Sequence, residues 1–232
     1  ARLKEAVDGW CSTVGMPDET LAEQIRRDRI DILVDLSGHS TDGRLLVFAR
    51  KPAPVQVTAW GHATGTGLPT MDYFLADPVY VPKEVRPLFA EKVFDLPCWA
   101  CYEPPDYAPE VSALPTLAGR AFTFGCVNRI EKISDTTIAL WARILAAAPE
   151  SNLLVKGRAL DDAKLKDELL ERLQSAGIAT QRVRLLGNSP HAEHLKVYHE
   201  IDLALDPYPQ GGGVSTAEAL WMGVPVVTLL GP

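Results

Sequence analysis

A run of glycines near the end of the chain is the first feature that could do chemistry. In PYPQGGGVSTAEALWMGVPVVTLLGP, Gly211, Gly212 and Gly213 precede a helix-like stretch that begins near Ser215. Glycines let backbone N–H groups approach a ligand, and a helix start adds free N–H groups and the positive end of its dipole. The pattern predicts an anion site, and a diphosphate is the anion such loops usually bind. The alternative is a structural turn, with Ser215 and Glu218 spaced as a Ser-x-x-Glu capping box.

A lysine follows the first strand of the same region. In CVNRIEKIS, Lys132 lies just before a predicted helix that Ser134 or Asp135 can cap. A lysine there could reach a phosphate at the edge of the sheet and neutralise the charge of a leaving diphosphate. Without the glycine loop, a solvated surface lysine would be the preferred interpretation.

Two loops earlier in the chain carry histidines at strand ends. In DLSGHS, Asp35 and His39 stand four residues apart across a Ser-Gly turn, and WGHATGTG places His62 after a later strand. A carboxylate and an imidazole at a strand end can orient a hydroxyl or move a proton. The alternative is that Asp35 caps its turn, that His39 packs against a neighbour, and that the His62 loop is only a turn.

The remaining candidate ligands do not form a metal motif. His191 and His194 share one helix face in SPHAEHLKVYHE, His199 lies on another, and the string is not HExxH. Cys98 and Cys101 form a single CxxC without a second ligand pair. Nor do two aspartates stand two residues apart. We therefore expect no metal, with any diphosphate chemistry carried by cationic side chains and helix ends.

The order of the predicted elements gives the fold class. A helix in residues 17–29 feeds a buried strand in IDILVDLSGH, followed by strands in PVQVTAW, DYFLAD and KVFDLP. After a Pro-rich stretch, strands alternate with helices of about 10–16 residues, which predicts parallel sheets covered on both faces. The second region reads strand AFTFGCV, helix SDTTIALWARILAAAP, strand NLLVKG, helix DDAKLKDELLERLQSAG, strand VRLLG, helix HAEHLKVYHEI, strand DLALD, helix STAEALWMG and strand VPVVTLL. We predict an α/β protein with domains in 1–97 and 118–232 and a linker in 98–117.

Composition excludes several classes of protein. The 232 residues are 47% hydrophobic and 23% charged, as in ordinary globular proteins. A net charge of -7 argues against a nucleic-acid-coating protein. The sequence has neither an apolar run long enough to span a membrane nor a signal-peptide pattern. Because four scattered cysteines are too few for a disulfide framework, we expect a reduced, cytoplasmic protein with no membrane or nucleic-acid partner.

Several strings resemble the catalytic region of bacterial O-linked N-acetylglucosamine transferases. They are DILVDLSGH, LLVFARKPAPVQVTAWGHATGTGLPTMDY, EKVFDLP, NRIEKIS and GGGVSTAEALWMGVPVVTL, and they run in order from about Asp31 to the last residue. These are inverting GT-B glycosyltransferases related to the animal nucleocytoplasmic enzyme and to plant SPINDLY-type proteins. The resemblance implies two Rossmann-like domains with parallel sheets flanked by helices. Residues 1–97 would be the C-terminal part of the first, and 118–232 a truncated nucleotide-sugar-binding domain.

The resemblance also implies a reaction and its residues. A Ser or Thr hydroxyl of an acceptor protein would displace UDP from the anomeric carbon with inversion, the expected donor being UDP-N-acetylglucosamine and no cofactor being required. Lys132 would hold the diphosphate, and Asp35 and His39 would line the sugar and acceptor side. His194 would lie close to the nucleotide, and Glu218 would accept the ribose hydroxyls. The residues expected to bind the nucleotide sugar are Gly61, His62, Ala63, Asn128, Arg129, His191, His194, Gly212, Gly213, Val214, Ser215, Thr216 and Glu218.

Three departures from the animal enzyme leave alternatives open. Arg129 replaces a glutamine, Gly213-Val214-Ser215 replaces His-Thr-Thr, and Val197 stands where an arginine is found. These changes shift donor binding towards backbone amides, so glucose, fucose or another UDP- or GDP-sugar remains possible, as does an asparagine acceptor. The alternative functions are a non-catalytic nucleotide-binding or protein-interaction domain, and a GT-B transferase with a lipid or polysaccharide acceptor.

The resemblance also predicts segments outside this chain. The family's tetratricopeptide superhelix is absent, as is the first part of the N-terminal Rossmann-like domain, which carries another active-site histidine. Further strand–helix units are expected after Pro232. We therefore expect the 232-residue piece alone to be a poor catalyst.

Overall fold

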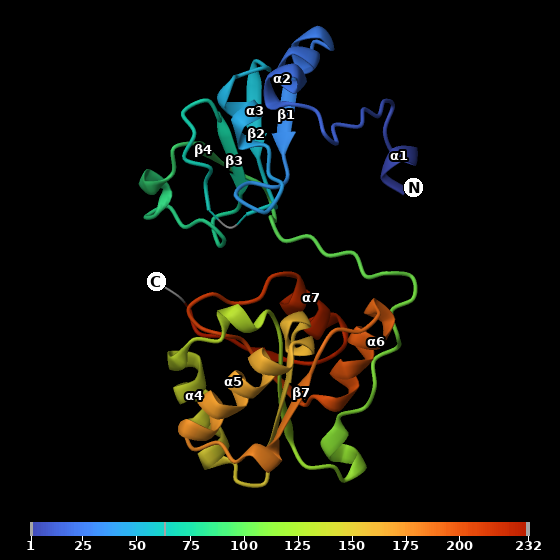
Figure 1. The fold of residues 1–232 in the computed structure, drawn as a ribbon, viewed down its shortest axis with the longest axis vertical. Coiled ribbons are helices and arrows are strands. Elements are labelled where there is room, and N and C mark those ends of the chain that lie inside the picture. The colour runs from blue at the N-terminus through green and yellow to red at the C-terminus, as the bar shows by residue number, and fades with distance from the viewer. Residues whose placement is uncertain (1, 63, 231–232) are drawn as a thin grey trace. The chain divides into compact units, whose positions relative to one another are not determined.

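The computed structural model describes residues 2–62 and 64–230 of the chain. It divides into two compact units, unit 1 (Ala1–Cys101) and unit 2 (Tyr102–Pro232) (Figure 1). The division lies inside the segment 98–117 that the sequence predicts as a linker. Each unit contains a parallel sheet, as predicted. None of the helices in the described residues is long and apolar enough to cross a membrane.

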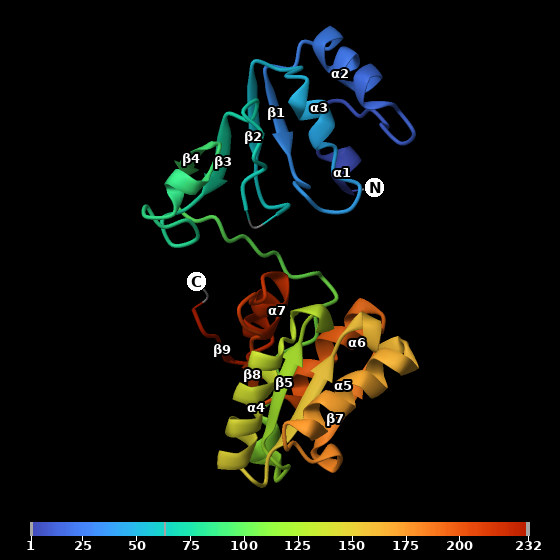
Figure 2. The same ribbon diagram turned by 60° about the vertical axis from the view of Figure 1, so that its left-hand side comes forward.

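Unit 1 is built on a four-stranded parallel sheet in the order β1-β2-β3-β4. Helices α2 and α3 pack against each other beside β1 and β2 (Figure 2). The elements of unit 1 are α1 (Arg2–Glu5), α2 (Asp18–Arg27), β1 (Ile32–Asp35), α3 (Leu45–Ala49), β2 (Val55–Thr58), β3 (Tyr73–Ala76), the 3-10 turn η1 (Arg86–Leu88) and β4 (Lys92–Asp95).

Strand β1 departs from its prediction as a buried strand. It lies at the edge of the sheet, and Ile32 and Val34 are 61% and 45% exposed, while Asp35 on the opposite face is 4% exposed. A continuous apolar run suggests a strand covered on both faces, but it cannot show whether a second layer is present. The expectation of full burial is therefore wrong for this strand.

Unit 2 is built on a five-stranded parallel sheet in the order β7-β6-β5-β8-β9. The crossovers between successive strands run through helices, as predicted. The elements of unit 2 are η2 (Pro115–Ala118), β5 (Thr123–Val127), η3 (Ile130–Lys132), α4 (Asp135–Ala147), β6 (Asn152–Lys156), η4 (Arg158–Asp161), α5 (Ala163–Ser175), η5 (Thr180–Arg182), β7 (Val183–Leu186), α6 (His191–Lys196), η6 (Val197–Glu200), β8 (Leu203–Leu205), α7 (Val214–Trp221) and β9 (Val226–Val227).

The ends of the helices follow local chemistry. The side chain of Ser134 accepts a hydrogen bond from the Thr137 N–H at 3.1 Å and caps α4, as expected from the sequence. Asp162 caps α5 in the same way. Helix α6 is shorter than predicted because its last turn tightens into the 3-10 turn η6. Strand β9 is limited to two residues, although the apolar pattern extends further.

Alternate residues of the strands in unit 2 face two different apolar clusters. Leu153 and Val155 pack with Trp141 of α4 and Leu173 of α5. Leu154, one residue out of phase, packs with residues of α6, η6 and α7. Because side chains alternate between the faces of a strand, the sheet is buried on both faces. This double burial is what holds the carboxyl ends of the strands in fixed positions.

The packing of α5 provides a stability test with an internal control. Leu173 is fully buried, whereas Leu165 on the same helix is 37% exposed. We expect Leu173→Ala to lower the free energy of unfolding by about 2–5 kcal/mol, because it removes buried contacts and leaves a cavity. Leu165→Ala should cost less than about 1 kcal/mol. Urea unfolding followed by circular dichroism measures both, and equal losses would contradict the assigned packing of α5.

Candidate functional site

Polar groups of unit 2 gather where strands β5 and β8 end. The two strands are neighbours in the sheet, yet the chain leaves β5 towards β6 and β7 and leaves β8 towards β9. Open parallel sheets bind ligands at such a reversal of strand order. The segment 128–134 follows β5 and the segment 206–213 follows β8, so both predicted parts of the site lie at this edge.

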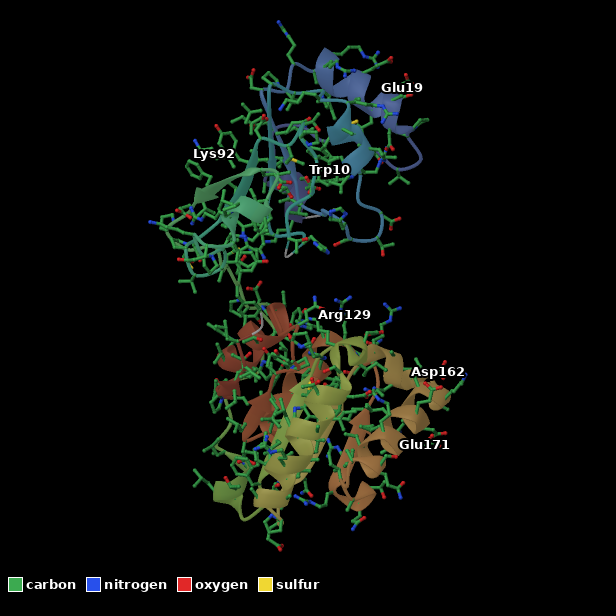
Figure 3. All side chains as sticks on the ribbon, turned by 90° about the vertical axis from the view of Figure 1, so that its left-hand side faces the viewer. Trp10, Glu19, Lys92, Arg129, Asp162 and Glu171 are labelled. Carbon is green, nitrogen blue, oxygen red and sulfur yellow. The ribbon has the colours of Figure 1, made fainter. Side chains whose placement is uncertain are left out.

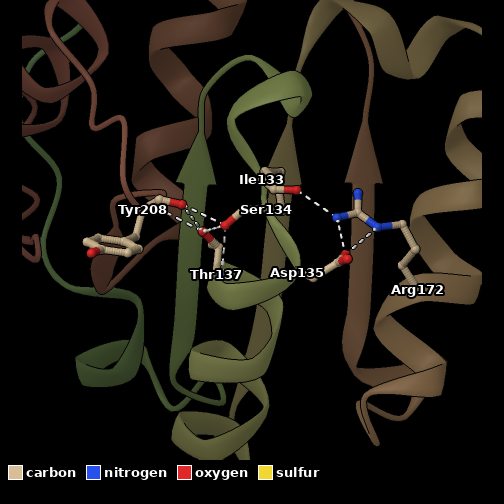
Figure 4. A network of polar contacts seen from close by, with 6 residues as sticks. All are labelled: Ile133, Ser134, Asp135, Thr137, Arg172 and Tyr208. Carbon is tan, nitrogen blue, oxygen red and sulfur yellow. Dashed lines mark hydrogen bonds and ion pairs between the residues drawn. The ribbon is translucent and has the colours of Figure 1, made fainter. Parts of the chain in front are cut away.

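The segment after β8 is tied to the start of α4 (Figure 4). The hydroxyls of Ser134 and Thr137 donate to the carbonyl oxygen of Tyr208 at 2.7 and 2.9 Å, and the Tyr208 N–H donates to Thr137 Oγ1 at 2.9 Å. On the other side of α4, the guanidinium of Arg172 donates to the Asp135 carboxylate at 2.8 Å. These contacts fix the position from which the glycine loop begins.

Lys132 reaches the glycine loop from the β5 side. Its Nζ donates to the carbonyl oxygen of Gly211 at 2.6 Å. Partial burial lowers the pKa of Lys132 below its usual range, the nearby Arg129 lowers it further, and Asp206 opposes both effects. An ammonium has three N–H donors, so this contact leaves two for a ligand. Arg129 itself is exposed and lies at the same edge of unit 2 (Figure 3).

The carboxylate of Asp206 binds the backbone of the glycine loop, and this residue was not predicted from the sequence. Its Oδ1 accepts a hydrogen bond from the Gly212 N–H at 2.8 Å, and its Oδ2 accepts one from Thr228 Oγ1 at 3.1 Å. A Cβ at Gly211 would lie 2.4 Å from Asp206 Oδ2, so a side chain there would displace the carboxylate from its hydrogen bond with Gly212. The signal was available, because Asp206 is the last residue of the predicted strand DLALD, at its carboxyl end.

The start of α7 does not use the capping box that its sequence allows. Its N-cap is Gly213, which makes no side-chain cap, and Glu218 points to other partners. A Cβ at Gly212 would lie 2.6 Å from Ser215 Oγ and 2.4 Å from Thr216 Oγ1. Two hydroxyls therefore flank the glycine backbone, and the capping box that the spacing of Ser215 and Glu218 allows is not formed.

A small cavity with both apolar and polar lining residues lies behind the loop. Its volume is about 20 Å³, and its lining includes Asn128, Asp206 and Thr216. The hydroxyl of Thr216 is buried and has no hydrogen-bond partner within the described residues. A cavity of this size admits one water molecule when polar groups surround it. A water or a ligand oxygen at this point would satisfy Thr216.

The buried carboxylate of Glu218 contacts two histidines of α6, and these three residues are called the Glu218 cluster. His191 Nε2 lies 2.8 Å from Glu218 Oε1, and His194 Nε2 lies 3.4 Å from Oε2. Burial raises the pKa of Glu218, but the hydrogen bonds from His194 and His191 outweigh it and hold the pKa below its usual range. The two histidines share a helix face, as predicted, whereas His199 faces away and bonds to the carbonyl oxygen of Glu110.

The tautomer of His191 follows from its partners. An ionised carboxylate only accepts hydrogen bonds, so the His191 Nε2 must carry a hydrogen. In the neutral ring the Nδ1 then accepts from the hydroxyl of Tyr107, which lies 2.9 Å away. The carboxylate of Glu218 is thereby oriented from α6, and its remaining lone pairs are free to accept from hydroxyl groups of a ligand.

In unit 1, Asp35 is engaged with its own loop. Its carboxylate accepts hydrogen bonds from the N–H groups of Ser37 and Gly38 and from Thr58 Oγ1, at distances of 2.8–3.1 Å. No hydrogen bond joins Asp35 to His39 in the described residues. The carboxylate therefore positions the turn that carries His39.

The two histidine loops of unit 1 touch each other. The rings of His39 and His62 meet edge to face with their centroids 5.3 Å apart. Gly38 adopts a φ of +53°, and a Cβ on Gly61 would lie 2.3 Å from the backbone of Leu36. The glycines thus allow the contact between the loops. Ala63, predicted to belong to this site, lies outside the described residues.

Comparison with known proteins identifies the family of the chain. The sequence pattern of glycosyl transferase family 41 matches residues 12–99 and 112–231. The chain belongs to glycosyltransferase family 41. A curated relative from Arabidopsis thaliana, the probable UDP-N-acetylglucosamine–peptide N-acetylglucosaminyltransferase SPINDLY, is 38% identical over 96% of the chain and 24% of its own length. The probable transferase SEC of the same plant is 26% identical over 98% of the chain and 24% of its own length.

Solved structures support the same family. An O-GlcNAc transferase variant from Thermobaculum terrenum is 40% identical and superposes with a TM-score of 0.93 over 99% of the chain and 44% of its own. The predicted GT-B fold class and the family resemblance are confirmed by this match. The lipopolysaccharide galactosyltransferase WaaB shares the fold alone, with 15% identity and a TM-score of 0.58 over 90% of the chain and 59% of its own. The chain spans about a quarter of the length of these curated relatives.

The role of Asp206 can be tested without a ligand. We expect Asp206→Ala to raise the rate of hydrogen exchange at the Gly212 amide about tenfold or more, because a charge-assisted hydrogen bond is lost. Thr228→Val is the control, since it removes only the partner of the other carboxylate oxygen. Exchange can be measured by NMR. A Gly212 amide that exchanges at the wild-type rate in Asp206→Ala would show that the carboxylate does not hold the loop.

Proposed function

We propose that this chain is the donor-binding part of an inverting protein glycosyltransferase that moves N-acetylglucosamine from UDP-N-acetylglucosamine to Ser or Thr hydroxyls. The observation that carries the proposal is the convergence at one sheet edge of Lys132, the glycine loop and the Glu218 cluster. The first two suit a diphosphate and the third suits ribose hydroxyls. The names of the curated relatives supply the sugar and the acceptor class.

In the proposed binding mode, the nucleotide diphosphate lies over the glycine loop. Lys132 supplies positive charge, and the N–H groups at the start of α7 supply the partial charge of a helix end. Gly213 leaves the approach open, since nothing lies within 4 Å of a Cβ placed there. The Glu218 carboxylate accepts the ribose hydroxyls. Val214 is 66% exposed and so lies beside the ligand rather than in the core.

In the proposed reaction, the hydroxyl oxygen of the acceptor bonds to the anomeric carbon as the bond from that carbon to the diphosphate oxygen breaks, and the hydroxyl proton passes to water. The charge that develops on the diphosphate is held by Lys132 and the backbone of the loop. We assign His39 and His62 to the sugar and acceptor side, with Asp35 positioning His39. The full-length protein is proposed to be cytoplasmic and to carry a tetratricopeptide superhelix for acceptor proteins.

The proposal includes catalysis without a metal ion, because side chains and helix ends supply the positive charge. Turnover by the full-length protein should be unchanged in the presence of EDTA. The measurement is transfer of labelled sugar to a peptide, with and without the chelator. A loss of activity that added Mg²⁺ or Mn²⁺ restores would contradict this part of the proposal.

The donor site is tested by calorimetric titration of the chain with UDP. We expect Lys132→Ala to bind UDP about 10–100-fold more weakly, because contacts between an ammonium and a phosphate contribute about 1.5–3 kcal/mol. Lys164→Ala is the matched control, since Lys164 is an exposed lysine of unit 2 whose ammonium, among the residues that the structure describes, pairs with Glu168 alone.

The nucleotides GDP and ADP serve as competitors in the same titration. Tighter binding of GDP would replace the proposed donor by a GDP-sugar and leave the phosphate site in place. Unchanged UDP binding by Lys132→Ala would remove Lys132 from the site. In the full-length protein, normal peptide glycosylation by a Lys132→Ala variant would contradict the catalytic role proposed for Lys132.

A further inference from the structure

A cavity of about 360 Å³ opens at the amino ends of the strands of the sheet in unit 2. It lies at the beginnings of β5, β6 and β7, whereas the candidate donor site lies at the carboxyl ends of the strands. A strand rises about 3.3 Å per residue, so the five residues of β5 separate the two sites by about 16 Å. The cavity is lined by Arg120, Ala121, Thr123, Asn152, Leu153, Leu154, Gln181, Arg182, Val183, Arg184 and Glu200.

The cavity is positively charged in an acidic chain. Three arginines and one glutamate line it, which gives a formal charge of +3 − 1 = +2, against -7 for the whole chain. Arg120, Arg182 and Arg184 come from three different segments: the approach to β5, the 3-10 turn η5, and β7. Surface charges usually alternate in sign, so a concave cluster of guanidinium groups in this chain is a local exception.

Only part of the donor capacity of the arginines is used by the fold. Arg182 binds the carbonyl oxygens of Ser151 and Ala148 through Nε and Nη2 at 2.7 and 2.8 Å, which leaves Nη1. Arg184 makes a two-fold contact with the Glu200 carboxylate at 2.7 and 2.8 Å, which leaves Nε. The charge of Arg120 acts on the same carboxylate, and no hydrogen bond from its guanidinium occurs in the described residues.

Neutral donors complete the lining. The side-chain amides of Asn152 and Gln181 make no hydrogen bond within the described part of the chain, and both line the cavity. Glu200 is the only anionic side chain among the lining residues. Two further hollows share Arg120 with this cavity, one of them bounded by His199 and Glu200 as well. Arg120 therefore borders three concave surfaces.

We infer that this cavity binds the phosphate group of a small phosphorylated molecule. Planar guanidinium groups with several N–H donors match phosphate oxygens, and a phosphate dianion balances the formal charge of +2. The volume is within the usual range for small-molecule sites and exceeds what a phosphate group alone fills. The site is separate from the proposed donor site, so its test does not depend on that proposal.

Two substitutions with opposite expected effects test the inference. The chain is titrated with inorganic phosphate at constant ionic strength, and backbone amide shifts in NMR spectra give both the affinity and the place of binding. Arg120→Ala should bind phosphate about tenfold or more weakly, because it loses the guanidinium with the most unused donors. Glu200→Gln should bind phosphate several-fold more tightly, since it removes the competing anion and frees the fork of Arg184.

The controls separate local binding from general charge effects. Arg143→Ala removes an exposed arginine of α4 outside the cavity and should leave the affinity unchanged. Arg120→Lys keeps the charge without the fork, and an intermediate affinity is expected. It also serves as the second variant if Arg120→Ala unfolds. Glucose 6-phosphate should bind more tightly than inorganic phosphate because its sugar fills more of the cavity.

Several results would overturn the inference. Unchanged phosphate affinity in Arg120→Ala and Arg120→Lys, or no gain in Glu200→Gln, would show that the arginines form only a structural and solvated surface. Shifts at the Gly212 amide instead of the starts of β5, β6 and β7 would place the anion at the donor site. Equal affinities for the two phosphates would remove the small-molecule assignment.

Discussion

The candidate donor site depends on the hydrogen bonds that join the start of α4 to the segment after β8. Three hydrogen bonds between Tyr208 and the hydroxyls of Ser134 and Thr137 join two segments that are about 70 residues apart in sequence. The sheet supplies the foundation, because β5 and β8 are paired and buried on both faces. With the backbone fixed at Tyr208, the glycine loop starts in one place, and Lys132 can reach the carbonyl oxygen of Gly211 from the β5 side.

The glycine loop shows why glycine and a carboxylate are needed together. Asp206 accepts the Gly212 N–H, and the same carboxylate fills the space where a side chain of residue 211 would lie. Gly212 in turn lies against the hydroxyls of Ser215 and Thr216. A side chain at Gly211 or Gly212 would therefore push away a polar group that packs against the loop. The result is a loop whose backbone can face a ligand without a side chain in between.

The alternation of strands and helices was enough to predict the parallel sheet of unit 2, whereas the parallel sheet of unit 1 followed only from the family resemblance. The same reasoning found Lys132 and the shared face of His191 and His194. It failed where a residue's partner comes from elsewhere in the chain. The local spacing of Ser215 and Glu218 suggested a cap, but the two histidines of α6 bind the carboxylate. Asp206 was missed because one aspartate after a strand carries no motif. The exposure of β1 depends on whether another element packs over that face of the sheet, and the local sequence pattern cannot show this.

The charge state of Lys132 links the candidate site to its proposed ligand. Burial and the charge of Arg129 lower the pKa of Lys132, so the ammonium is held in an environment that disfavours its charge. A diphosphate would reverse both effects, because it brings two or more negative charges next to the same nitrogen. The pKa of Lys132 must then rise on binding, and by linkage the gain favours anionic ligands over neutral ones. In the proposed binding mode, the two neighbouring cations would favour a diphosphate over a neutral ligand, and their charge would be in place when the leaving group needs it.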